Sequence, residues 1–392
     1  MRRARTPRTP FRLPRITTAL AAVPLALTAA VVPAAAAPAP AAEHATTERA
    51  DRGHHGRDTL RDAAPKGFFI GTAVAGGGHH AEQPYADPFA YDVEYRDRMA
   101  REFNSLSAEN QMKWEYIHPT RDFYNFYPAD AIVRYAQENR QVVRGHTLLW
   151  HSQNPAWLEE GDFSDEELRE ILHEHITTVV GRYAGRIQQW DVANEIFDEN
   201  GEYREENIWI RELGPGIVAD AFRWAHEADP RAKLFFNDYG VESINAKSDA
   251  YYALIQDLKA DGVPVHGFAP QSHLSTRYGF PGDLQANLQR FADLGLETAI
   301  TELDVRMDLP EGGEPTAAQQ AQQADYYRRA LQACLGVDTC NSFTIWGFTD
   351  RYSWVPVFFP AEGSATVMTE DYERKPAYHA LQDTLRSVRG KR

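Results

Sequence analysis

Cysteine is nearly absent from this sequence, which has only two in 392 residues. The chain also contains no G-x-S-x-G segment, the tight turn that exposes the nucleophile of many serine hydrolases, and no G-x-x-x-x-G-K-[ST] loop, which would hold phosphate groups. Beyond residue 37, no apolar run reaches the roughly 18 residues that a membrane-spanning helix requires. These absences argue against a serine hydrolase, a P-loop nucleotide-binding protein and a further membrane span.

Basic side chains are outnumbered, since 41 Lys and Arg residues stand against 56 Asp and Glu residues, for a formal net charge of −15. Residues 1–37 hold six of the arginines and no acidic side chain, so the rest of the chain is more acidic still. Binding to nucleic acid requires basic side chains that neutralise phosphates. We therefore expect no nucleic-acid partner, and an acidic exterior suits an exported protein whose partner is neutral or small.

Residues 1–37 have the pattern of a secretory signal peptide. Their arginines precede the uncharged stretch ITTALAAVPLALTAAVVPAAAA, and small residues around Ala35 to Ala37 offer cleavage points. A membrane anchor is the alternative, but the stretch is rich in alanine and interrupted by Pro24 and Pro33. We expect a secreted, extracellular protein with no attachment to the membrane after cleavage.

The remainder of the chain divides into two parts. Residues 38–65 are small and polar without apolar periodicity, which predicts a flexible lead-in. Residues 66–390 have an even composition without a Gly/Ser-rich or Pro/Thr-rich linker, which predicts a single domain. The only cysteines, Cys334 and Cys340, lie in ACLGVDTC, and an exported compartment would oxidise them to a disulfide. A metal-binding cysteine pair is the alternative, but no histidine lies nearby.

Short apolar runs alternate with amphipathic stretches along residues 66–390. One helical stretch, residues 164–184, begins with Ser164 and has Glu167 at the third following position, and another spans residues 316–335. Strands that alternate with helices form parallel sheets, and eight such units predict an α/β fold with a closed (β/α)8 TIM barrel. The predicted strands are residues 67–74, 103–110, 141–150, 187–194, 233–238, 265–274, 297–305 and 342–348.

Two glutamates follow strands on different parts of the predicted barrel. Glu195 ends the fourth strand in WDVANEIFDEN, and Glu302 follows the seventh in ITELDV. Because the carboxyl ends of barrel strands meet at one rim, these carboxylates can converge across the barrel mouth. Two carboxylates on either side of a bond are what glycoside hydrolysis requires, although a single acid after a strand is equally well an ordinary solvated side chain.

The neighbouring strand ends supply side chains that suit a sugar. Amides, imidazoles and an ammonium group can hydrogen-bond to hydroxyls, and tryptophan can stack on the C–H face of a sugar ring, although any one tryptophan is more often a core residue. The side chains at this rim are Glu109, Asn110, Lys113, His146, Trp150, His151, Asn237, Asp238, Tyr239, Gln271, His273, Trp346 and Trp354.

The segment GGGHHAEQPYADP, residues 76–88, contains side chains that can bind a metal. His79 and His80 could combine with Asp87, but adjacent histidines on a glycine-rich loop do not converge easily on one ion. A second adjacent pair, His54 and His55, lies in the predicted lead-in. We therefore expect no metal and no organic cofactor.

The strand-end motifs together resemble those of glycoside hydrolase family 10, the endo-β-1,4-xylanases, from about Gly67 to Leu381. The motifs are GTAV, EFNSLSAENQMKWE, RGHTLLWHSQNPAWL, WDVANEIFDE, NDYGVE, QSHL, ITELDVR and IWGFTDRYSW, in the family's order. The resemblance implies a single (β/α)8 catalytic domain over residues 66–390, with xylan and xylo-oligosaccharides as partners. It also implies a pair of cysteines that form a disulfide just before the eighth strand.

The resemblance also implies a role for each site residue. Glu195 matches the general acid/base and Glu302 the nucleophile of a retaining double displacement, with Glu195 in surroundings that raise its pKa. Asn194 should bind the 2-hydroxyl of the sugar, and His273 should keep Glu302 ionised with support from Asp304. The remaining matched sugar-binding positions are Glu109, Asn110, Lys113, His146, Trp150, Gln271, Trp346 and Trp354.

The hypothesis from the sequence is thus a secreted, monomeric endo-1,4-β-xylanase (EC 3.2.1.8). The closest alternative is the same machinery acting on β-1,4-glucan. Xylose lacks the exocyclic CH2OH group of glucose, so the space beside Trp346 and Trp354 would decide between the two substrates. A barrel that only binds polysaccharide is a second alternative. Departures from the family pattern at Gly240, Ala269 and Pro270, and a long loop at 76–91, leave both glutamates in place.

Overall fold

The computed structural model describes residues 58–309 and 313–389. The predicted signal peptide and residues 38–57 of the predicted lead-in lie outside the described residues. None of the helices in the described part of the chain combines the length and apolar character needed to cross a bilayer.

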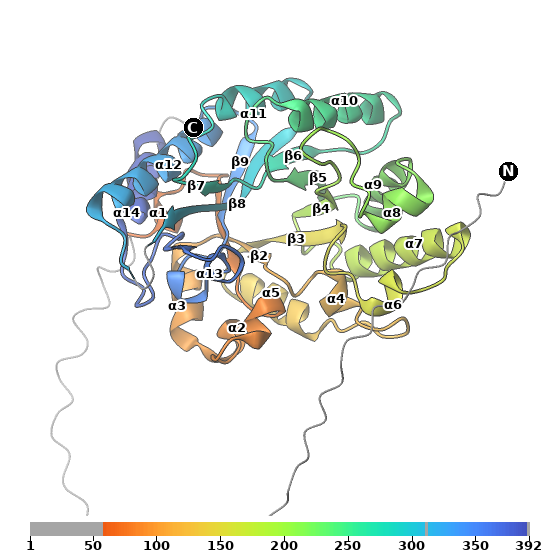
Figure 1. Ribbon diagram of the computed structural model, residues 1–392, viewed down its shortest axis with the longest axis horizontal. Helices are drawn as coiled ribbons and strands as arrows, with labels where there is room; N and C mark the ends of the chain where they lie inside the picture. The colour runs from red at the N-terminus through yellow and green to blue at the C-terminus, as the bar shows by residue number, and fades with distance from the viewer. Residues whose placement is uncertain (1–57, 310–312, 390–392) are drawn as a thin grey trace, which may run out of the picture. The chain divides into compact units, whose positions relative to one another are not determined.

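Parallel strands form a closed barrel at the centre of the domain (Figure 1). Each barrel strand pairs with the next along the chain, and the last pairs with the first, as the register of Phe69 with Ser342 shows. The predicted (β/α)8 barrel is confirmed. Its strands are β1 (Phe69–Val74), β2 (Ser105–Ala108), β3 (Val142–Leu149), β4 (Gln189–Asn194), β5 (Lys233–Asp238), β6 (Gly267–Pro270), β8 (Glu297–Asp308) and β9 (Cys340–Ile345).

Two short strands lie outside the barrel. β7 (His273–Ser275) pairs with β8 in parallel, and β10 (Glu362–Gly363) pairs with β8 in antiparallel orientation. The predicted sixth strand, 265–274, is thus divided between β6 and β7. Pro270 has no N–H to donate, and Ser272 has a left-handed φ of 68°, so the extended conformation ends between them.

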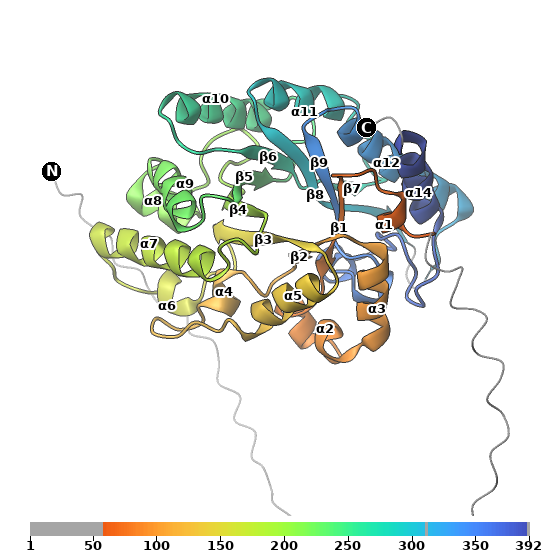
Figure 2. The same ribbon diagram turned by 180° about the vertical axis from the view of Figure 1, so that it is seen from behind.

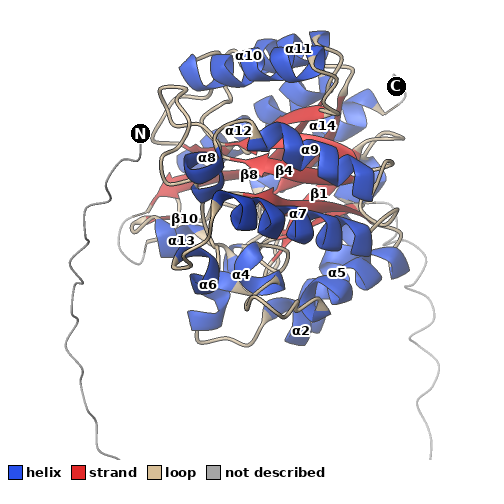
Figure 3. Cartoon of the chain, turned by 90° about the vertical axis from the view of Figure 1, so that its right-hand side faces the viewer, coloured by secondary structure: helices blue, strands red, loops and turns tan. Residues whose placement is uncertain are grey.

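Helices surround the barrel, as the two opposite views and the side view show (Figure 2, Figure 3). They cover the outer face of the strands, because the apolar side chains of strands and helices pack together there in one large core. The longer helices are α3 (Val93–Glu102), α5 (Tyr127–Glu138), α7 (Asp165–Arg182), α9 (Ile217–Ala228), α10 (Ala246–Ala260), α11 (Leu284–Asp293), α12 (Ala317–Leu335) and α14 (Pro376–Val388). The shorter ones are α1 (Leu60–Ala63), α2 (Pro88–Tyr91), α4 (Trp114–Ile117), α6 (Ala156–Glu159), α8 (Ile208–Leu213), α13 (Val355–Phe358), and the 3-10 turns η1 (Gly78–Glu82) and η2 (Asp350–Tyr352).

Local sequence explains where the two predicted helices begin. The Ser164 hydroxyl accepts from the backbone N–H of Glu167, and the Glu167 carboxylate accepts from the backbone N–H of Ser164, which starts α7. Thr316 and Gln319 make the same reciprocal pair at α12. Such capping boxes satisfy backbone N–H groups that have no partner within the helix. Both helix starts are confirmed.

The folded domain begins earlier than predicted, because part of the predicted lead-in is ordered. Leu60 in α1 is fully buried, and α1 packs against α14. Asp58 forms ion pairs with Arg374 at 3.0 Å and with Arg386. The prediction that residues 58–65 are flexible is therefore wrong, since one apolar side chain and one charge-paired aspartate anchor them.

Candidate active site

A cavity of about 610 Å³ opens at the carboxyl ends of the barrel strands. Eleven of the predicted site side chains line it, and Asn194 and Asp304 are fully buried directly beside them. The eleven are Glu109, Asn110, Lys113, His146, Trp150, Glu195, Gln271, His273, Glu302, Trp346 and Trp354. The other residues that line the cavity are His79, Ser152, Gln153, Tyr239, Gly240, Glu242, Arg306, Phe358 and Phe359. No role was predicted for Ser152, Gln153, Glu242, Arg306, Phe358 or Phe359.

Glu195 sits at the end of β4 in an unusual backbone conformation. Its φ is 53°, in the left-handed region that costs a non-glycine residue roughly 1 kcal/mol. Its N–H donates to the carbonyl of Asn237 on β5 at 3.0 Å, which holds the residue in place. Backbone strain of this kind is concentrated at functional sites.

The Glu195 carboxylate is held by two neutral donors. Trp150 Nε1 donates to Oε2 and Gln271 Nε2 donates to Oε1, each at 2.8 Å, and His151 Nδ1 lies 3.9 Å from Oε2. Burial alone would raise the pKa of Glu195, but these hydrogen bonds and the nearby imidazoles lower it below its ordinary value. The expectation that the surroundings raise this pKa is therefore wrong for the free protein.

Glu302, on β8, has a different set of partners. Asn237 Nδ2 donates to Oε1 at 2.7 Å, and His273 Nε2 lies 3.2 Å from Oε2. His146 Nδ1 is 3.9 Å from Oε1. The backbone N–H of Glu302 donates to the carbonyl of Gln271 at 2.9 Å, so the residue that contacts Glu195 by its side chain also fixes Glu302 by its backbone.

His273 is a cation beside Glu302. Its Nδ1 lies 2.8 Å from Oδ2 of Asp304, and the same oxygen accepts a hydrogen bond from Trp354 Nε1 at 2.8 Å. Burial would lower the pKa of His273, but the carboxylates of Asp304 and Glu302 outweigh it and raise the pKa to about 10. The structure thus brings His273, Asp304 and Glu302 together as expected.

Asn237, on β5, connects the two halves of the site. Its Nδ2 donates both to Glu302 and to Asn194 Oδ1, the latter at 2.8 Å, and its Oδ1 accepts from Thr301 Oγ1 at 2.6 Å. Asn194 consequently keeps its own Nδ2 without a partner in the described part of the chain. A buried amide N–H2 without a protein partner is available to a ligand.

A buried ion pair beneath the cavity was not predicted. Arg144 and Asp191, on β3 and β4, are both almost fully buried and form an ion pair in which Nε lies 3.2 Å from Oδ2. Asp191 Oδ2 also lies 3.0 Å from His146 Nδ1, which positions that ring toward Glu302. The sequence signal was a charged residue inside each of two apolar strands, since buried charges require partners.

Lys113 interacts electrostatically with Glu109, Glu195 and Glu302, but its hydrogen bonds go to neutral oxygens. Its Nζ donates to Gln153 Oε1 at 2.7 Å and to Asn110 Oδ1 at 3.2 Å, and it lies 4.9 Å from the centre of the Trp150 ring. Burial lowers the pKa of Lys113, while the charges of Glu302, Glu109 and Glu195 oppose that effect. Gln153, two positions after the predicted His151, was missed.

The loop at residues 76–88 differs from its prediction. Asp87 does not face the histidines, because its side chain caps α2 by accepting from the N–H of Ala90 at 2.8 Å. His79 and His80 converge instead on Glu109, with His80 Nε2 at 2.8 Å and His79 Nε2 at 3.9 Å from its carboxylate. The two adjacent histidines thus approach a shared carboxylate that was not predicted to be their partner.

The two cysteines form the predicted disulfide. Cys334, near the end of α12, is bonded to Cys340 at the start of β9, and both are fully buried. The bond lies at the amino end of its strand, whereas the cavity lies at the carboxyl ends. It therefore belongs to the framework and not to the site.

Known proteins resemble this chain in both sequence and structure. Residues 59–384 match the sequence profile of glycosyl hydrolase family 10. Endo-1,4-beta-xylanase B of Thermotoga neapolitana is 44% identical over 292 residues, which cover 74% of this chain and 83% of the relative. Native xylanase 10B from Thermotoga maritima, known from a crystal structure, is 41% identical in sequence and superposes with a TM-score of 0.79. The match covers 85% of this chain and 100% of that one. Xylanase 10B from Thermotoga petrophila in complex with xylobiose has the same identity and TM-score, over 86% of this chain and 99% of that one.

Proposed function

The chain belongs to glycosyl hydrolase family 10, and on that premise we propose that it is a secreted endo-1,4-β-xylanase that cleaves internal xylosidic bonds of xylan with retention of configuration. The relatives described above are named xylanases, and one was crystallised with xylobiose. The observation that carries the proposal is the unequal partnering of two carboxylates in one cavity. Glu302 faces a cationic histidine, whereas Glu195 accepts hydrogen bonds from a neutral indole and a neutral amide.

In the first step, the Glu302 carboxylate attacks the anomeric carbon, and the bond from that carbon to the leaving oxygen breaks. Protonated Glu195 donates its proton to the leaving oxygen. His273, whose pKa is raised to about 10, places a positive charge 3.2 Å from Oε2 of Glu302. A bound sugar chain covers both carboxylates and excludes water. The loss of water disfavours the charged form of Glu195, so its pKa is higher in the complex than in the free protein.

In the second step, the glycosyl ester on Glu302 is hydrolysed. Esterification removes the negative charge of Glu302, so the electrostatic cost of ionising Glu195 falls and it acts as the base. Glu195 takes a proton from water, the resulting hydroxide bonds to the anomeric carbon, and Glu302 leaves as a carboxylate. Two inversions at the same carbon retain the configuration.

The other cavity side chains fit the binding of a neutral sugar chain. Asn194 has a free amide N–H for a hydroxyl beside the reacting carbon. Trp346 and Trp354 offer ring surface, and Trp354 is fixed by its hydrogen bond to Asp304. The proposed partners are xylan and xylo-oligosaccharides. Their further proposed contacts in the cavity are Glu109, Asn110, Lys113, His146, Trp150 and Gln271.

Export is supported by the sequence of residues 1–37 and by the disulfide, since oxidising compartments outside the cytosol sustain such bonds. We propose that the mature protein is an extracellular monomer. Mass spectrometry of the protein from the culture medium tests export and the removal of the signal peptide. A chain that begins near residue 38 is expected, and a full-length chain retained in the cells would contradict export.

The test of the activity compares reducing-sugar release from soluble xylan and from a soluble β-1,4-glucan by the purified protein. Glu302→Gln serves as the blank, because it removes the charge of the nucleophile while preserving its shape. Glu370→Gln, at an exposed position, is the matched control for the same chemical change elsewhere.

Release from xylan, well above that from glucan and lost in Glu302→Gln but not in Glu370→Gln, is the expected result. Comparable release from glucan would retain the mechanism and overturn the substrate. No release above the blank from either polymer would leave a barrel that only binds polysaccharide.

A further inference from the structure

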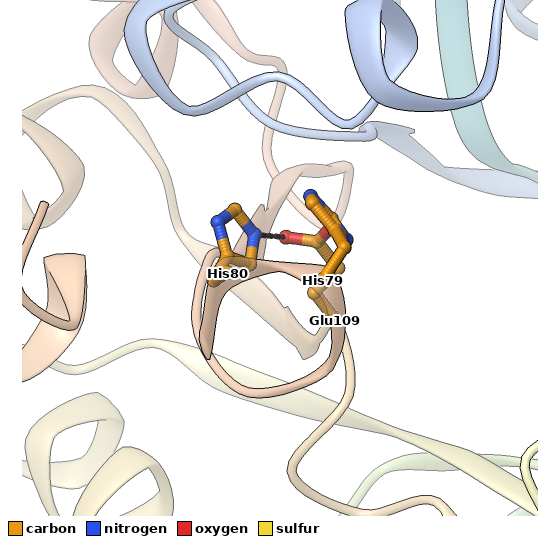
Figure 4. Close-up of side chains that lie close together, drawn as sticks. All are labelled: His79, His80 and Glu109. Atoms are coloured by element: carbon orange, nitrogen blue, oxygen red, sulfur yellow. Dashed lines mark hydrogen bonds and ion pairs between the residues drawn. The ribbon is translucent and has the colours of Figure 1, made fainter. Parts of the chain in front are cut away.

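Two histidines and a glutamate form a cluster (Figure 4), and two of its members, His79 and Glu109, line the cavity. His79 and His80 come from η1, and Glu109 follows β2. His80 Nε2 lies 2.8 Å from Oε2 of Glu109, and His79 Nε2 lies 3.9 Å from Oε1. One nitrogen or oxygen atom from each residue lies within 4.8 Å of the other two. Two imidazoles and a carboxylate are a donor set typical of zinc and related ions.

The burial of the His79 ring is not compensated by a hydrogen bond to Glu109. The His79 side chain is only 9% exposed, and its buried Nε2 has no hydrogen-bond partner in the described part of the chain. Buried ring nitrogens are nearly always partnered, and those that are not often mark the place of a ligand or ion.

His80 has the support that metal-binding histidines usually receive. Its second ring nitrogen, Nδ1, lies 2.9 Å from the hydroxyl of Tyr85. Tyr85 is in turn held edge-on against Tyr352, with 5.0 Å between ring centres. A partner on the far nitrogen fixes the tautomer and orientation of a ligating imidazole, with Nδ1–H donating to the tyrosine oxygen and Nε2 facing the ion.

We propose that His79, His80 and Glu109 form a binding site for one Zn²⁺ ion, with a fourth position open to water. Ligand atoms around tetrahedral zinc stand roughly 3.3 Å apart. Binding would therefore require the 3.9 Å gap between His79 and Glu109 to close slightly and the 2.8 Å contact of His80 to open slightly.

A bound ion would interfere with the sugar chain. Glu109 and His79 both line the cavity, and Glu109 is a proposed sugar contact. Zinc would occupy its carboxylate and place a positive charge near Lys113. We therefore expect zinc to compete with the polysaccharide and to raise KM more than it lowers kcat. This consequence rests on the proposed function, whereas the metal site itself does not.

Calorimetric titration of Zn²⁺ into the chelator-treated mature protein tests the site without reference to activity. His79→Asn is the main variant, because that ring makes no hydrogen bond through Nε2. Tyr85→Phe is the second, since it leaves all three ligands in place. The matched control is His54→Asn combined with His55→Asn, the other adjacent histidine pair of the chain. Far-ultraviolet circular dichroism checks that each variant is folded.

One zinc per chain is expected, with affinity at least about tenfold lower in His79→Asn, measurably lower in Tyr85→Phe and unchanged in the control. Glu302→Gln should bind zinc as the wild type does, which separates the site from hydrolysis. Equal zinc affinity in the wild type and His79→Asn would overturn the proposal. So would loss of binding in Glu302→Gln, because the ion would then lie on the catalytic carboxylates.

Inhibition is then measured on xylan. At ten times the wild-type dissociation constant, zinc should raise the apparent KM of the wild type about elevenfold by competitive mass action and that of His79→Asn by about twofold at most. Equal inhibition of both proteins would contradict the competition. If neither protein releases sugar, the proposed function fails while the calorimetric result still decides the metal site.

Discussion

His273 Nε2 lies 3.2 Å from Oε2 of Glu302, and this contact separates the roles of the two candidate catalytic glutamates. The imidazole is kept charged from its other side by Asp304, at 2.8 Å. Glu195 has no such cation at hydrogen-bond distance, since its direct partners are Trp150 and Gln271. Glu302 therefore has a positively charged partner at hydrogen-bond distance, whereas the direct partners of Glu195 are neutral.

Replacing Asp304 with Asn should lower the pKa of His273. The raised pKa means that the ring is charged at neutral pH and loses its proton only near pH 10. Without the Asp304 carboxylate, the burial that opposes the charge is less well compensated, so deprotonation should move to lower pH. Nitrogen-15 NMR of labelled histidine follows the titration directly. His175, whose pKa burial lowers well below the usual value, is an internal reference. An unchanged His273 midpoint in Asp304→Asn would contradict this account.

The stereochemistry of cleavage tests the two roles together. Proton NMR should detect the β-anomer as the first product of a β-linked oligosaccharide. On an aryl β-xylobioside, whose leaving group needs no proton, Glu195→Ala should still form the glycosyl ester but hydrolyse it about 10²- to 10⁴-fold more slowly. Added azide should accelerate that step and yield a β-glycosyl azide. An α-anomer released first by the wild type would show inversion and exclude the proposed covalent step.

Much of the fold could be predicted from periodicity and caps. The predicted strand 233–238 coincides with β5, and the helix after Ser164 begins where its capping box indicated. These features are local, so a single sequence contains them. The convergence of strand ends at one rim follows from the barrel, which explains why the predicted site residues line one cavity.

Features set by pairing between strands could not be predicted. The register shifts between Asp191 and Ala193 on β4, shortly before Glu195, and between Ile300 and Leu303 on β8, a span that contains Glu302. Such bulges redirect side chains, but they depend on the neighbouring strand and have no signature within one segment. The sequence placed Asn237 at the rim, but its hydrogen bond to Glu302 from a third strand depends on the same strand registers and could not be predicted.

Removal of the disulfide should reduce stability and leave catalysis unchanged. Cys334 and Cys340 close a loop with a sequence separation of 6, for which loop-closure entropy contributes about 2 kcal/mol. Chemical denaturation should show that loss in the Cys334→Ala, Cys340→Ala double variant. Its kcat should match the wild type, because the bond lies at the amino end of β9, away from the cavity. A reducing agent should destabilise the wild type but not the variant; a large drop in kcat would contradict the assignment to the framework.

Mild acid should destabilise the fold partly through His175, on α7. Its ring is fully buried, stacks on Trp114 with 3.4 Å between ring centres, and shares one hydrogen bond with His118. Burial lowers its folded pKa well below 6.5, so below that pH the unfolded chain binds a proton that the folded chain does not.

The contribution of His175 is therefore fully present above about pH 6.5 and falls by up to about 1.4 kcal/mol for each pH unit below it. His175→Phe keeps an aromatic ring but cannot titrate, so its free energy of unfolding should change less between pH 7 and pH 5 than that of the wild type. His173→Phe, on the same helix with a side chain that is 38% exposed, should keep the wild-type pH dependence. Equal slopes in all three proteins would show that His175 gains its proton without unfolding, and that the stacked histidine cluster admits water.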